Sequence, residues 1–208
     1  MTVLVTGNLG YIGSVLTPML GQRGHQVRGF DSGYFRDCLL SPAVEPPEQI
    51  VKDIRDLERE DLDGITAVVH LAGLSNDPLG ELDESLTEVI NYDGSIRLGE
   101  LARDAGVRRL VYASSQSMYG RAAVGAELEE DTSEKNPLTA YARTKWEAEQ
   151  GLLALRSPGF EVTALRPSTV YGSSPRLRCD IVFNNFVACA YTTGAIEIKS
   201  DGTPRRPA

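Results

Sequence analysis

Short apolar segments alternate with segments of helical spacing along most of the 208 residues. The apolar segments are typical of buried strands. They lie at residues 2–6, 26–31, 49–54, 65–73, 108–115 and 160–167, with a shorter one at 195–200. Helical spacing predicts helices over residues 12–24, 81–105 and 179–193, and a further one that ends near Arg156. Strands that alternate with helices form a parallel sheet with helices on both faces, so the pattern predicts a doubly wound α/β fold.

The start of one helix and one domain boundary are predicted from local sequence signals. The helix that ends near Arg156 is expected to start at Asn136-Pro137, with Asn136 as the N-cap and Pro137 in the first turn. The regular alternation of strands and helices fades near residue 170, where a loop that contains arginines begins. We therefore expect one domain over residues 1–170 and a different region over 171–208.

The stretch TGNLGYIG at residues 6–13 places three glycines between the first strand and the first helix. A strand that turns directly into a helix presents free N–H groups and the positive end of the helix dipole to an anion. Gly7, Gly10 and Gly13 allow a tight turn, close approach of a pyrophosphate, and close packing of helix on strand. The spacing differs from G-x-G-x-x-G, but the strand before it and the helix after it favour a dinucleotide site.

Two acidic positions follow later strands. Asp31 ends the second strand, 18 residues beyond Gly13, where a carboxylate can accept hydrogen bonds from the ribose hydroxyls of adenosine. No arginine directly follows Asp31, which favours NAD over NADP. The pair Asp53-Ile54 has two interpretations: it contacts the adenine, or Asp53 is a surface residue that starts the charged run 53–61.

A second candidate site combines Tyr141, Lys145 and Ser115. Tyr141 and Lys145 are four residues apart on a predicted helix and share one face of it. An ammonium near a phenol stabilises the phenolate and lowers the tyrosine pKa from about 10 toward neutrality. Such a tyrosine can exchange a hydroxyl proton while a hydride moves to or from a nicotinamide. Ser115 follows the fifth strand, where its hydroxyl can bind the reacting oxygen.

Composition narrows the class of protein. A net charge of -8 and a pI near 4.9 argue against a nucleic-acid binder. Two histidines and three cysteines without paired spacing argue against a metal site. The cysteines are expected to be reduced, buried or partly buried thiols in a cytoplasmic protein. No apolar run approaches the ~20 residues of a membrane span. The largest basic cluster, which leaves room for a local anion site, is Arg176, Arg178, Arg205 and Arg206.

These motifs together resemble an extended short-chain dehydrogenase/reductase of the NAD-dependent nucleotide-sugar epimerase/dehydratase family. The resemblance is carried by TGNLGYIG, Asp31, DI at 53–54, HLAG at 70–73, Asn91, SSQSMYG at 114–120, YARTK at 141–145 and LRPSTVYG at 165–172. It implies a Rossmann domain that binds NAD over 1–170 and an incomplete substrate-binding region over 171–208. It also implies a nucleotide-sugar substrate and a cytoplasmic homodimer that pairs through the helices near 81–105 and 138–156.

The same resemblance assigns the site. Ser115, Tyr141 and Lys145 form the catalytic set, and Ser115, Ser117 and Asn185 face the substrate. The substrate-side asparagine matches the pair Asn184-Asn185, of which Asn185 is the better match. His70 and Tyr119 are interpreted as packing residues. The implied cofactor-binding residues are Gly7, Asn8, Leu9, Gly10, Tyr11, Ile12, Gly13, Asp31, Asp53, Ile54, Leu71, Ala72, Gly73, Asn91, Ser114, Tyr141, Lys145, Pro167 and Val170. No metal ligand is expected.

Two departures from the family pattern refine the expected activity. Gln116-Ser117 stands where family dehydratases usually carry an Asp-Glu pair, and family members usually continue for roughly another hundred residues. We therefore expect a nucleotide-sugar epimerase that oxidises and reduces C4 of an NDP-sugar. The alternatives are an NAD(P)H-dependent reductase of a keto sugar or small carbonyl compound, and an NAD-binding protein without catalytic activity.

Overall fold

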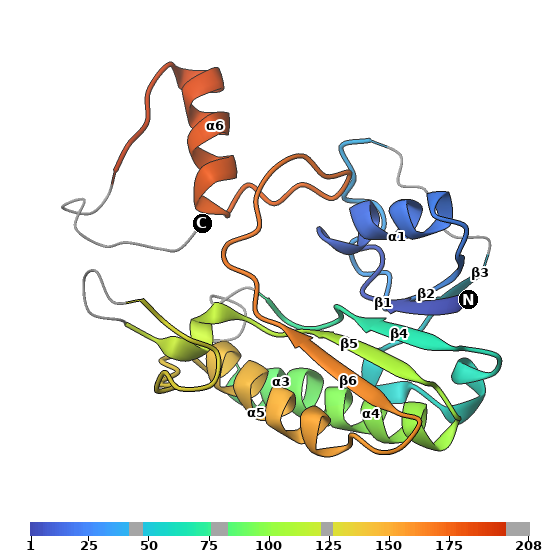
Figure 1. The fold of residues 1–208 in the computed structure, drawn as a ribbon. Helices are drawn as coiled ribbons and strands as arrows, with labels where there is room; N and C mark the ends of the chain where they lie inside the picture. Colours follow the sequence, from blue (N-terminus) through green and yellow to red (C-terminus); the bar gives the residue numbers. More distant parts are fainter. Residues whose placement is uncertain (42–47, 76–82, 122–126, 199–208) are drawn as a thin grey trace.

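The computed structural model describes residues 1–41, 48–75, 83–121 and 127–198. Within these residues, six strands form one parallel sheet in the order β3-β2-β1-β4-β5-β6 (Figure 1). The strands are β1 (Thr2–Thr6), β2 (Gln26–Asp31), β3 (Glu48–Val51), β4 (Ala67–His70), β5 (Arg109–Ala113) and β6 (Glu161–Leu165). The predicted doubly wound fold is confirmed. The strand order reverses between β1 and β4, and in such sheets ligands bind beyond the carboxyl ends of the strands at that point.

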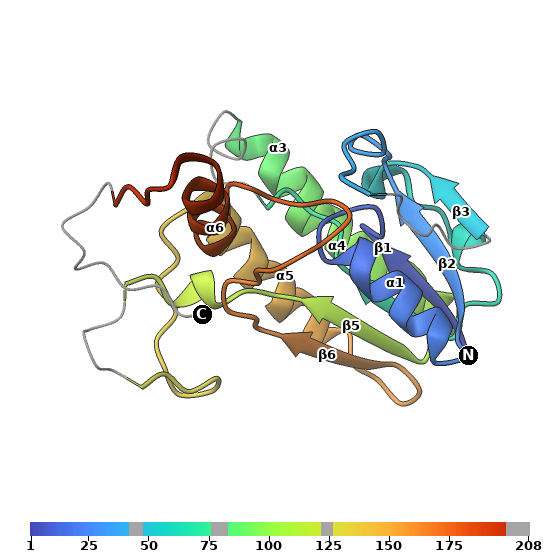
Figure 2. The ribbon, with the colours of Figure 1, turned by 90° about the horizontal axis from the view of Figure 1, so that it is seen from above.

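Helices cover both faces of the sheet (Figures 1 and 2). One face carries α1 (Gly13–Gln22), and the other carries α3 (Glu84–Glu88), the π-helical turn η3 (Val89–Asp93), α4 (Gly94–Asp104) and α5 (Ala140–Ala154). Short 3-10 turns are η1 (Ile54–Asp56), η2 (Arg59–Leu62) and η4 (Gln116–Tyr119). A last helix, α6 (Val182–Thr193), stands away from the sheet, and none of its residues is buried.

The core explains why the strands read as continuous apolar runs. Leu4 packs in the cluster with α4 and α5, whereas Val3 and Val5 pack in the cluster on the α1 side. Successive side chains of a strand point to opposite faces, and both faces here are covered by helices. Leu98 of α4 and Leu152 of α5 are fully buried, and each contributes on the order of 2 kcal/mol.

The structure corrects the predicted start of the fourth helix. Helix α5 begins at Ala140, and its N-cap is Thr139, whose Oγ1 accepts a hydrogen bond from the N–H of Ala142 at 3.1 Å. Asn136 instead donates its N–H to the carbonyl of Met118 at 2.8 Å. The residue before a proline is restricted from helical geometry, which favours this extended course along η4.

Other corrections concern strand ends and the cysteines. Strand β3 ends at Val51 and β4 at His70, so the predicted strands 49–54 and 65–73 are too long at their carboxyl ends. Residues 195–198 form no strand, and positions 199 and 200 of that prediction lie outside the described residues. Cys38 and Cys179 are exposed rather than partly buried.

Candidate active site

The glycine turn has the geometry that a dinucleotide requires. Gly7 has a φ of +72°, and a Cβ at this position would lie 2.8 Å from the backbone nitrogen of Ala72. A Cβ on Gly13 would overlap the carbonyl oxygen of Gly7. The N–H of Gly10 closes the turn on the same carbonyl at 3.0 Å. A side chain is thus excluded at Gly7 and at Gly13, and this leaves the backbone at the start of α1 open to an anion such as a pyrophosphate.

Asp31 is held beside this turn at the end of β2. Its Oδ2 accepts the N–H of Leu9 at 3.2 Å, and its Oδ1 accepts the N–H of Gly33 at 2.8 Å. Burial raises the pKa of Asp31, and these two N–H groups oppose that rise. The fixed carboxylate retains lone pairs for further donors, which fits the predicted contact with the ribose hydroxyls.

Asn8 faces the protein interior rather than the turn's open side. Its side-chain amide pairs reciprocally with that of Gln49 on β3, at 2.7 and 3.2 Å, and only 2% of Asn8 is exposed. A Cβ on Gly29 of β2 would collide with both amides. The pair therefore passes through the gap that Gly29 leaves and joins the glycine turn to the sheet edge. No pattern in the sequence predicts this contact.

Asp53 and Ile54 lie at the next strand end. Asp53 caps η1 through the N–H of Arg55 at 2.9 Å, and it pairs with the Arg55 guanidinium at 2.9 and 2.8 Å. The hydrogen bond from Arg55 lowers the pKa of Asp53. Ile54 is buried in the main core. The predicted contact of this pair with adenine stays a prediction.

Lys145 connects three of the predicted segments. It is 5% exposed, and its Nζ donates to the carbonyl of Ala113, the last residue of β5, at 2.9 Å. The ammonium also lies 4.8 Å from the centre of the Tyr112 ring. A Cβ on Gly73 would lie 3.7 Å from Nζ and 2.9 Å from Oδ1 of Asn91. Burial lowers the pKa of Lys145 to about 8.

Tyr141 lies one helical turn before Lys145, in the first turn of α5. Its phenol interacts electrostatically with Arg178. The pKa of Arg178 is raised mainly by its hydrogen bond with Asp180, and the interaction with Tyr141 adds to that rise. Ser115 caps η4, and its Oγ accepts hydrogen bonds from the N–H and the hydroxyl of Ser117 at 3.1 and 2.8 Å. Because both bonds are accepted, the Ser115 proton remains available for donation.

Asn91 positions the loop after β4 rather than standing open for a ligand. Its Oδ1 accepts the N–H of Leu74 at 2.8 Å, and its Nδ2 donates to the Leu74 carbonyl at 3.0 Å. This clamp fixes the segment Leu71–Gly73 beside Lys145, as the Gly73 contacts above require. Asn91 itself is 1% exposed and lies in the π-helical turn η3.

His70 is a fully buried structural residue, as predicted. Its Nδ1 lies 2.7 Å from Oγ1 of Thr6, and its Nε2 lies 2.8 Å from Oγ of Ser95. Ser95 donates to the carbonyl of Asn91 at 2.6 Å, so its oxygen accepts the hydrogen bond from Nε2–H of His70. Burial lowers the pKa of His70 to about 3, and the Lys145 ammonium adds to that effect.

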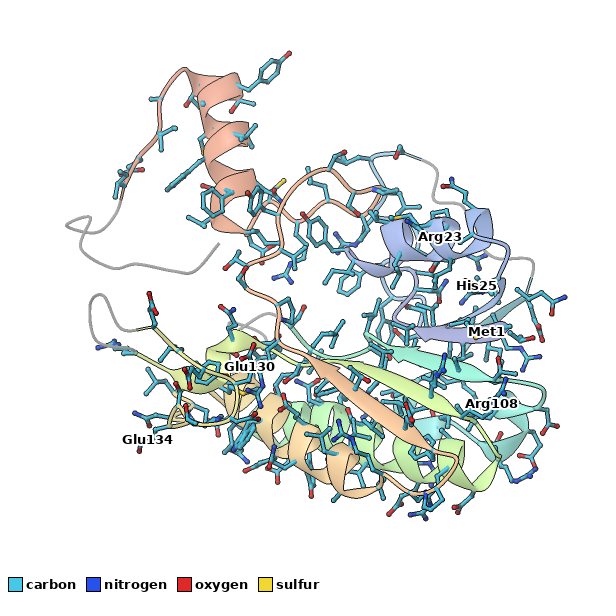
Figure 3. The ribbon with its side chains drawn as sticks, viewed as in Figure 1. Met1, Arg23, His25, Arg108, Glu130 and Glu134 are labelled. Atoms are coloured by element: carbon cyan, nitrogen blue, oxygen red, sulfur yellow. The ribbon has the colours of Figure 1, made fainter. Side chains whose placement is uncertain are left out.

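Tyr119 belongs to a buried ionic cluster that joins η4, α5 and β6. Arg166 donates Nε to both carboxylate oxygens of Glu149 at 3.1 Å and Nη1 to the Tyr119 hydroxyl at 2.7 Å. It also donates to the carbonyl of Glu130, which lies at the carboxyl edge of the sheet, opposite Arg108 at the amino edge (Figure 3). Glu149 is one turn beyond Lys145, so the cluster helps to orient α5, which carries Tyr141 and Lys145.

The remaining predicted residues are scattered around this edge. The N–H of Gln116 donates to the carbonyl of Pro167 at 3.3 Å, which places Pro167 beside η4. The Ser114 hydroxyl is buried and has no hydrogen-bond partner within the described residues. Val170 is exposed. Asn185 is exposed and donates to the carbonyl of Cys179 at 3.1 Å.

Two side chains of this region have positions that the sequence did not predict. Asn184, the neighbour of the preferred candidate Asn185, reaches the glycine turn, where its Nδ2 lies 3.1 Å from the hydroxyl of Tyr11. Arg178 donates to the hydroxyl of Ser75 at 2.9 Å, beside the loop after β4. The basic cluster in the sequence pointed to Arg178 but not to its position; Arg205 and Arg206 lie outside the described residues.

Within the parts of the chain that the structure describes, no group of three or more His, Cys, Asp or Glu side chains is arranged to hold a metal ion. None of the helices described has the length and apolarity that a membrane span needs.

A glycine turn at the switch point of a 3-2-1-4-5-6 sheet, with Tyr141 and Lys145 on a helix that is bonded to the end of β5, is the arrangement of short-chain dehydrogenase/reductase folds. More specifically, the chain belongs to the NAD dependent epimerase/dehydratase family, whose model matches residues 3–208. The members of this family are enzymes, and NAD is their cofactor.

Relatives with different names are similar to this chain in sequence. The 3 beta-hydroxysteroid dehydrogenase/Delta 5→4-isomerase of Mycobacterium tuberculosis is 35% identical over 184 residues, which cover 82% of this chain and 47% of that protein. The UDP-glucose 4-epimerase of Mycolicibacterium smegmatis is 33% identical over 185 residues, covering 83% of this chain and 57% of the relative.

Solved structures agree with the fold. MoeE5 in complex with UDP-glucose and NAD matches with a TM-score of 0.81 at 33% identity, covering 98% of this chain and 65% of the other. The chain thus spans about half the length of the curated relatives it matches and about two thirds of this structure.

Proposed function

We propose that this chain carries the cofactor site and catalytic residues of an NAD-dependent nucleotide-sugar 4-epimerase. One observation supports this above the others: the buried Lys145 ammonium binds the Ala113 carbonyl at the end of β5. Lys145 is one turn beyond Tyr141 on α5, and Ala113 is two residues before Ser115. The bond therefore brings the helix of the candidate base to the strand end of the candidate hydroxyl donor.

In this proposal, Tyr141 removes the proton from the C4 hydroxyl of the sugar and later returns it. Ser115 donates its free hydroxyl proton to the same oxygen and orients it, because both bonds from Ser117 leave that proton unused. Arg178 interacts electrostatically with the Tyr141 phenol, and Lys145 lies one helical turn from Tyr141. In this proposal the charge of both cations favours the phenolate. The chemistry that bound NAD supplies is reversible acceptance of the C4 hydride. The glycine turn and Asp31 hold the pyrophosphate and the adenosine ribose.

The residues beside Ser115 favour epimerisation over dehydration. Dehydratases of this family usually carry an acidic pair where this chain has Gln116 and Ser117, and removal of water from the sugar needs such groups. Here the Ser117 hydroxyl is instead hydrogen-bonded to Ser115. Names of relatives and solved neighbours that include UDP-sugar 4-epimerases are consistent with this choice.

A second candidate activity is a dehydrogenase or reductase that exchanges its cofactor. It is favoured by the hydroxysteroid dehydrogenase relative, because Tyr141, Lys145 and Ser115 would serve that chemistry equally. Net formation or consumption of NADH distinguishes it, since an epimerase completes both half-reactions on one bound cofactor.

The direct test is incubation with UDP-glucose, UDP-galactose and UDP-glucuronic acid in the presence of NAD, with chromatography of the sugar nucleotides. We expect a C4 epimer of at least one substrate without net NADH. Tyr141→Phe should lower the rate by at least about a hundredfold, because it removes the acid-base group. Tyr191→Phe is the matched control, because this tyrosine is 91% exposed on α6. No conversion of any of the three, or full activity in Tyr141→Phe, would contradict the proposal.

We also propose that the protein pairs as a homodimer through α3, α4 and α5. Leu86 and Val89 are 39% and 40% exposed on this side, which leaves apolar surface for a partner. Light scattering at micromolar concentration should give twice the monomer mass of 22.6 kDa, and a monomer mass would contradict the pairing.

A further inference from the structure

We propose that residues 172–178, which we name the strap, close over the dinucleotide site and set the rate at which NAD leaves, with the Tyr11 hydroxyl as an anchor. The inference rests on the proposed function and deepens it, because an epimerase must keep its cofactor through both half-reactions. After β6 the chain crosses to the side of α1 and then returns to α6 (Figures 1 and 2).

The first anchor is a closed ring of hydrogen bonds at the glycine turn. The Tyr11 hydroxyl donates to the carbonyl of Gly172 at 2.7 Å and accepts from Nδ2 of Asn184 at 3.1 Å. Oδ1 of Asn184 accepts the N–H of Gly172 at 2.9 Å. Tyr11 lies between two of the turn glycines, so the strap is bound to the same turn that is shaped for the pyrophosphate.

The second anchor is a pair of buried serines. Ser174 donates its hydroxyl to the carbonyl of Tyr11 at 2.8 Å, and its Oγ lies 3.0 Å from Oγ of Ser14 at the start of α1. Ser14 and Ser174 are only 3% and 7% exposed. Buried polar groups are costly when they lose their partners, so lifting the strap requires breaking a satisfied network.

Further contacts bind the strap to two other loops. The carbonyl of Pro175 accepts the N–H of Leu40 at 2.9 Å, and the Arg176 guanidinium lies 4.5 Å from the Phe35 ring centre. Arg178 donates to Ser75 at 2.9 Å. The strap therefore touches the loops that follow β1, β2 and β4. These loops surround the switch point of the sheet, so a dinucleotide bound there is enclosed and its release requires the strap to move.

A reversible disulfide between the strap and α1 tests directly whether movement of the strap limits the release of NAD. Ser14→Cys and Ser174→Cys are combined in a background in which Cys38, Cys179 and Cys189 are serine. The hydroxyl oxygens are 3.0 Å apart, close enough for two sulfurs to bond after a small adjustment. Oxidised glutathione takes two electrons and two protons from the thiols to form the disulfide, and dithiothreitol restores them.

The rate is measured by loading the protein with NADH, adding excess NAD, and following the loss of bound NADH fluorescence. We expect the oxidised protein to release NADH at least about tenfold more slowly than the same protein after dithiothreitol. Each single cysteine variant should show no such difference. Equal rates in the oxidised and reduced double variant would overturn the proposal, as would failure of the two cysteines to form the disulfide in the folded protein.

Loosening the anchor is the complementary test. Tyr11→Phe removes one accepted and one donated hydrogen bond while it keeps the ring, and Asn184→Ala removes the other side of the same network. Both should speed release about tenfold, with Tyr191→Phe as control. Unchanged rates in both variants would contradict the proposed role of the strap. Because no sugar is present in these experiments, they can refute the role of the strap without refuting epimerisation, and the reverse also holds.

Discussion

The burial of Lys145 predicts a specific dependence of stability on pH. Its pKa falls from 10.5 to about 8 in the folded protein, and the cause is removal of the ammonium from water. Between these two values the unfolded chain binds more protons than the folded one, so stability rises with pH in that window. Each pKa unit corresponds to about 1.4 kcal/mol, so the burial of the charge costs about 3 kcal/mol below pH 8, and this cost is relieved toward pH 10.5.

Lys145→Met isolates this effect, because methionine has a similar length and no titration. Urea unfolding of both proteins is compared at pH 7 and pH 10, where titration of other groups affects both equally. The free energy of unfolding of the wild type, relative to the variant, should increase by about 2 to 3 kcal/mol from pH 7 to pH 10, a relative shift of the midpoint near 1 M urea. A difference that is the same at both pH values would refute the buried, charged Lys145 on which the site depends.

Three other changes test the surrounding structure. His70 is buried in its neutral form and has a pKa of about 3, so acid favours the unfolded chain. Between pH 7 and pH 4 the free energy of unfolding, measured with urea, should fall by about 3 kcal/mol more in the wild type than in His70→Gln. Equal falls in the two proteins would contradict this. Glu149→Gln leaves the Arg166 charge unpaired and should cost about 3 kcal/mol, seen as a fall in Tm, whereas Glu147→Gln on the exposed side of α5 should change little; equal falls would argue against the buried pair. Asp31→Asn removes acceptor capacity at the ribose position and should weaken NAD binding about tenfold by calorimetry, and unchanged affinity would exclude that contact.

Much of the fold could be predicted because it depends on local pattern. The strands at 2–6 and 26–31 have the predicted bounds, since local signals set their ends: the glycine turn at Gly7 follows the first strand, and Gly24 and Gly33 flank the second. The predicted start of α5 was wrong because the true start depends on a contact with a residue distant in the sequence. Asn136 has strong capping character, yet its N–H binds the Met118 carbonyl, and Thr139 takes the cap.

In the site, too, some features could be predicted from local spacing and others depend on the tertiary structure. Tyr141 and Lys145 share a helix face, and their spacing alone predicts this. The partner of Lys145, the carbonyl of Ala113, has no sequence signature, because every residue carries such a group. Asn184 and Asn185 are neighbours on the first turn of α6, and only the helix's orientation decides that Asn184 faces Tyr11.

The amide pair of Asn8 and Gln49 likewise depends on sheet register. Gln49 lies opposite Gly29 in the β2–β3 ladder, and the absent side chain of Gly29 lets the two amides meet. A glycine in a strand indicates some close approach, but it does not identify the approaching group. The order of strands, known only from the structure, supplies that information.

The central claim is that Tyr141, Ser115 and Lys145 act on a sugar carbon beside one retained NAD. The most direct measurement uses the UDP-sugar that the protein epimerises, deuterated at C4 and incubated with the protein and NAD, with mass spectrometry of the separated products. The account predicts a C4 epimer that keeps its deuterium, without accumulation of NADH. Loss of the deuterium to solvent, or release of one reduced cofactor for each sugar consumed, would contradict it.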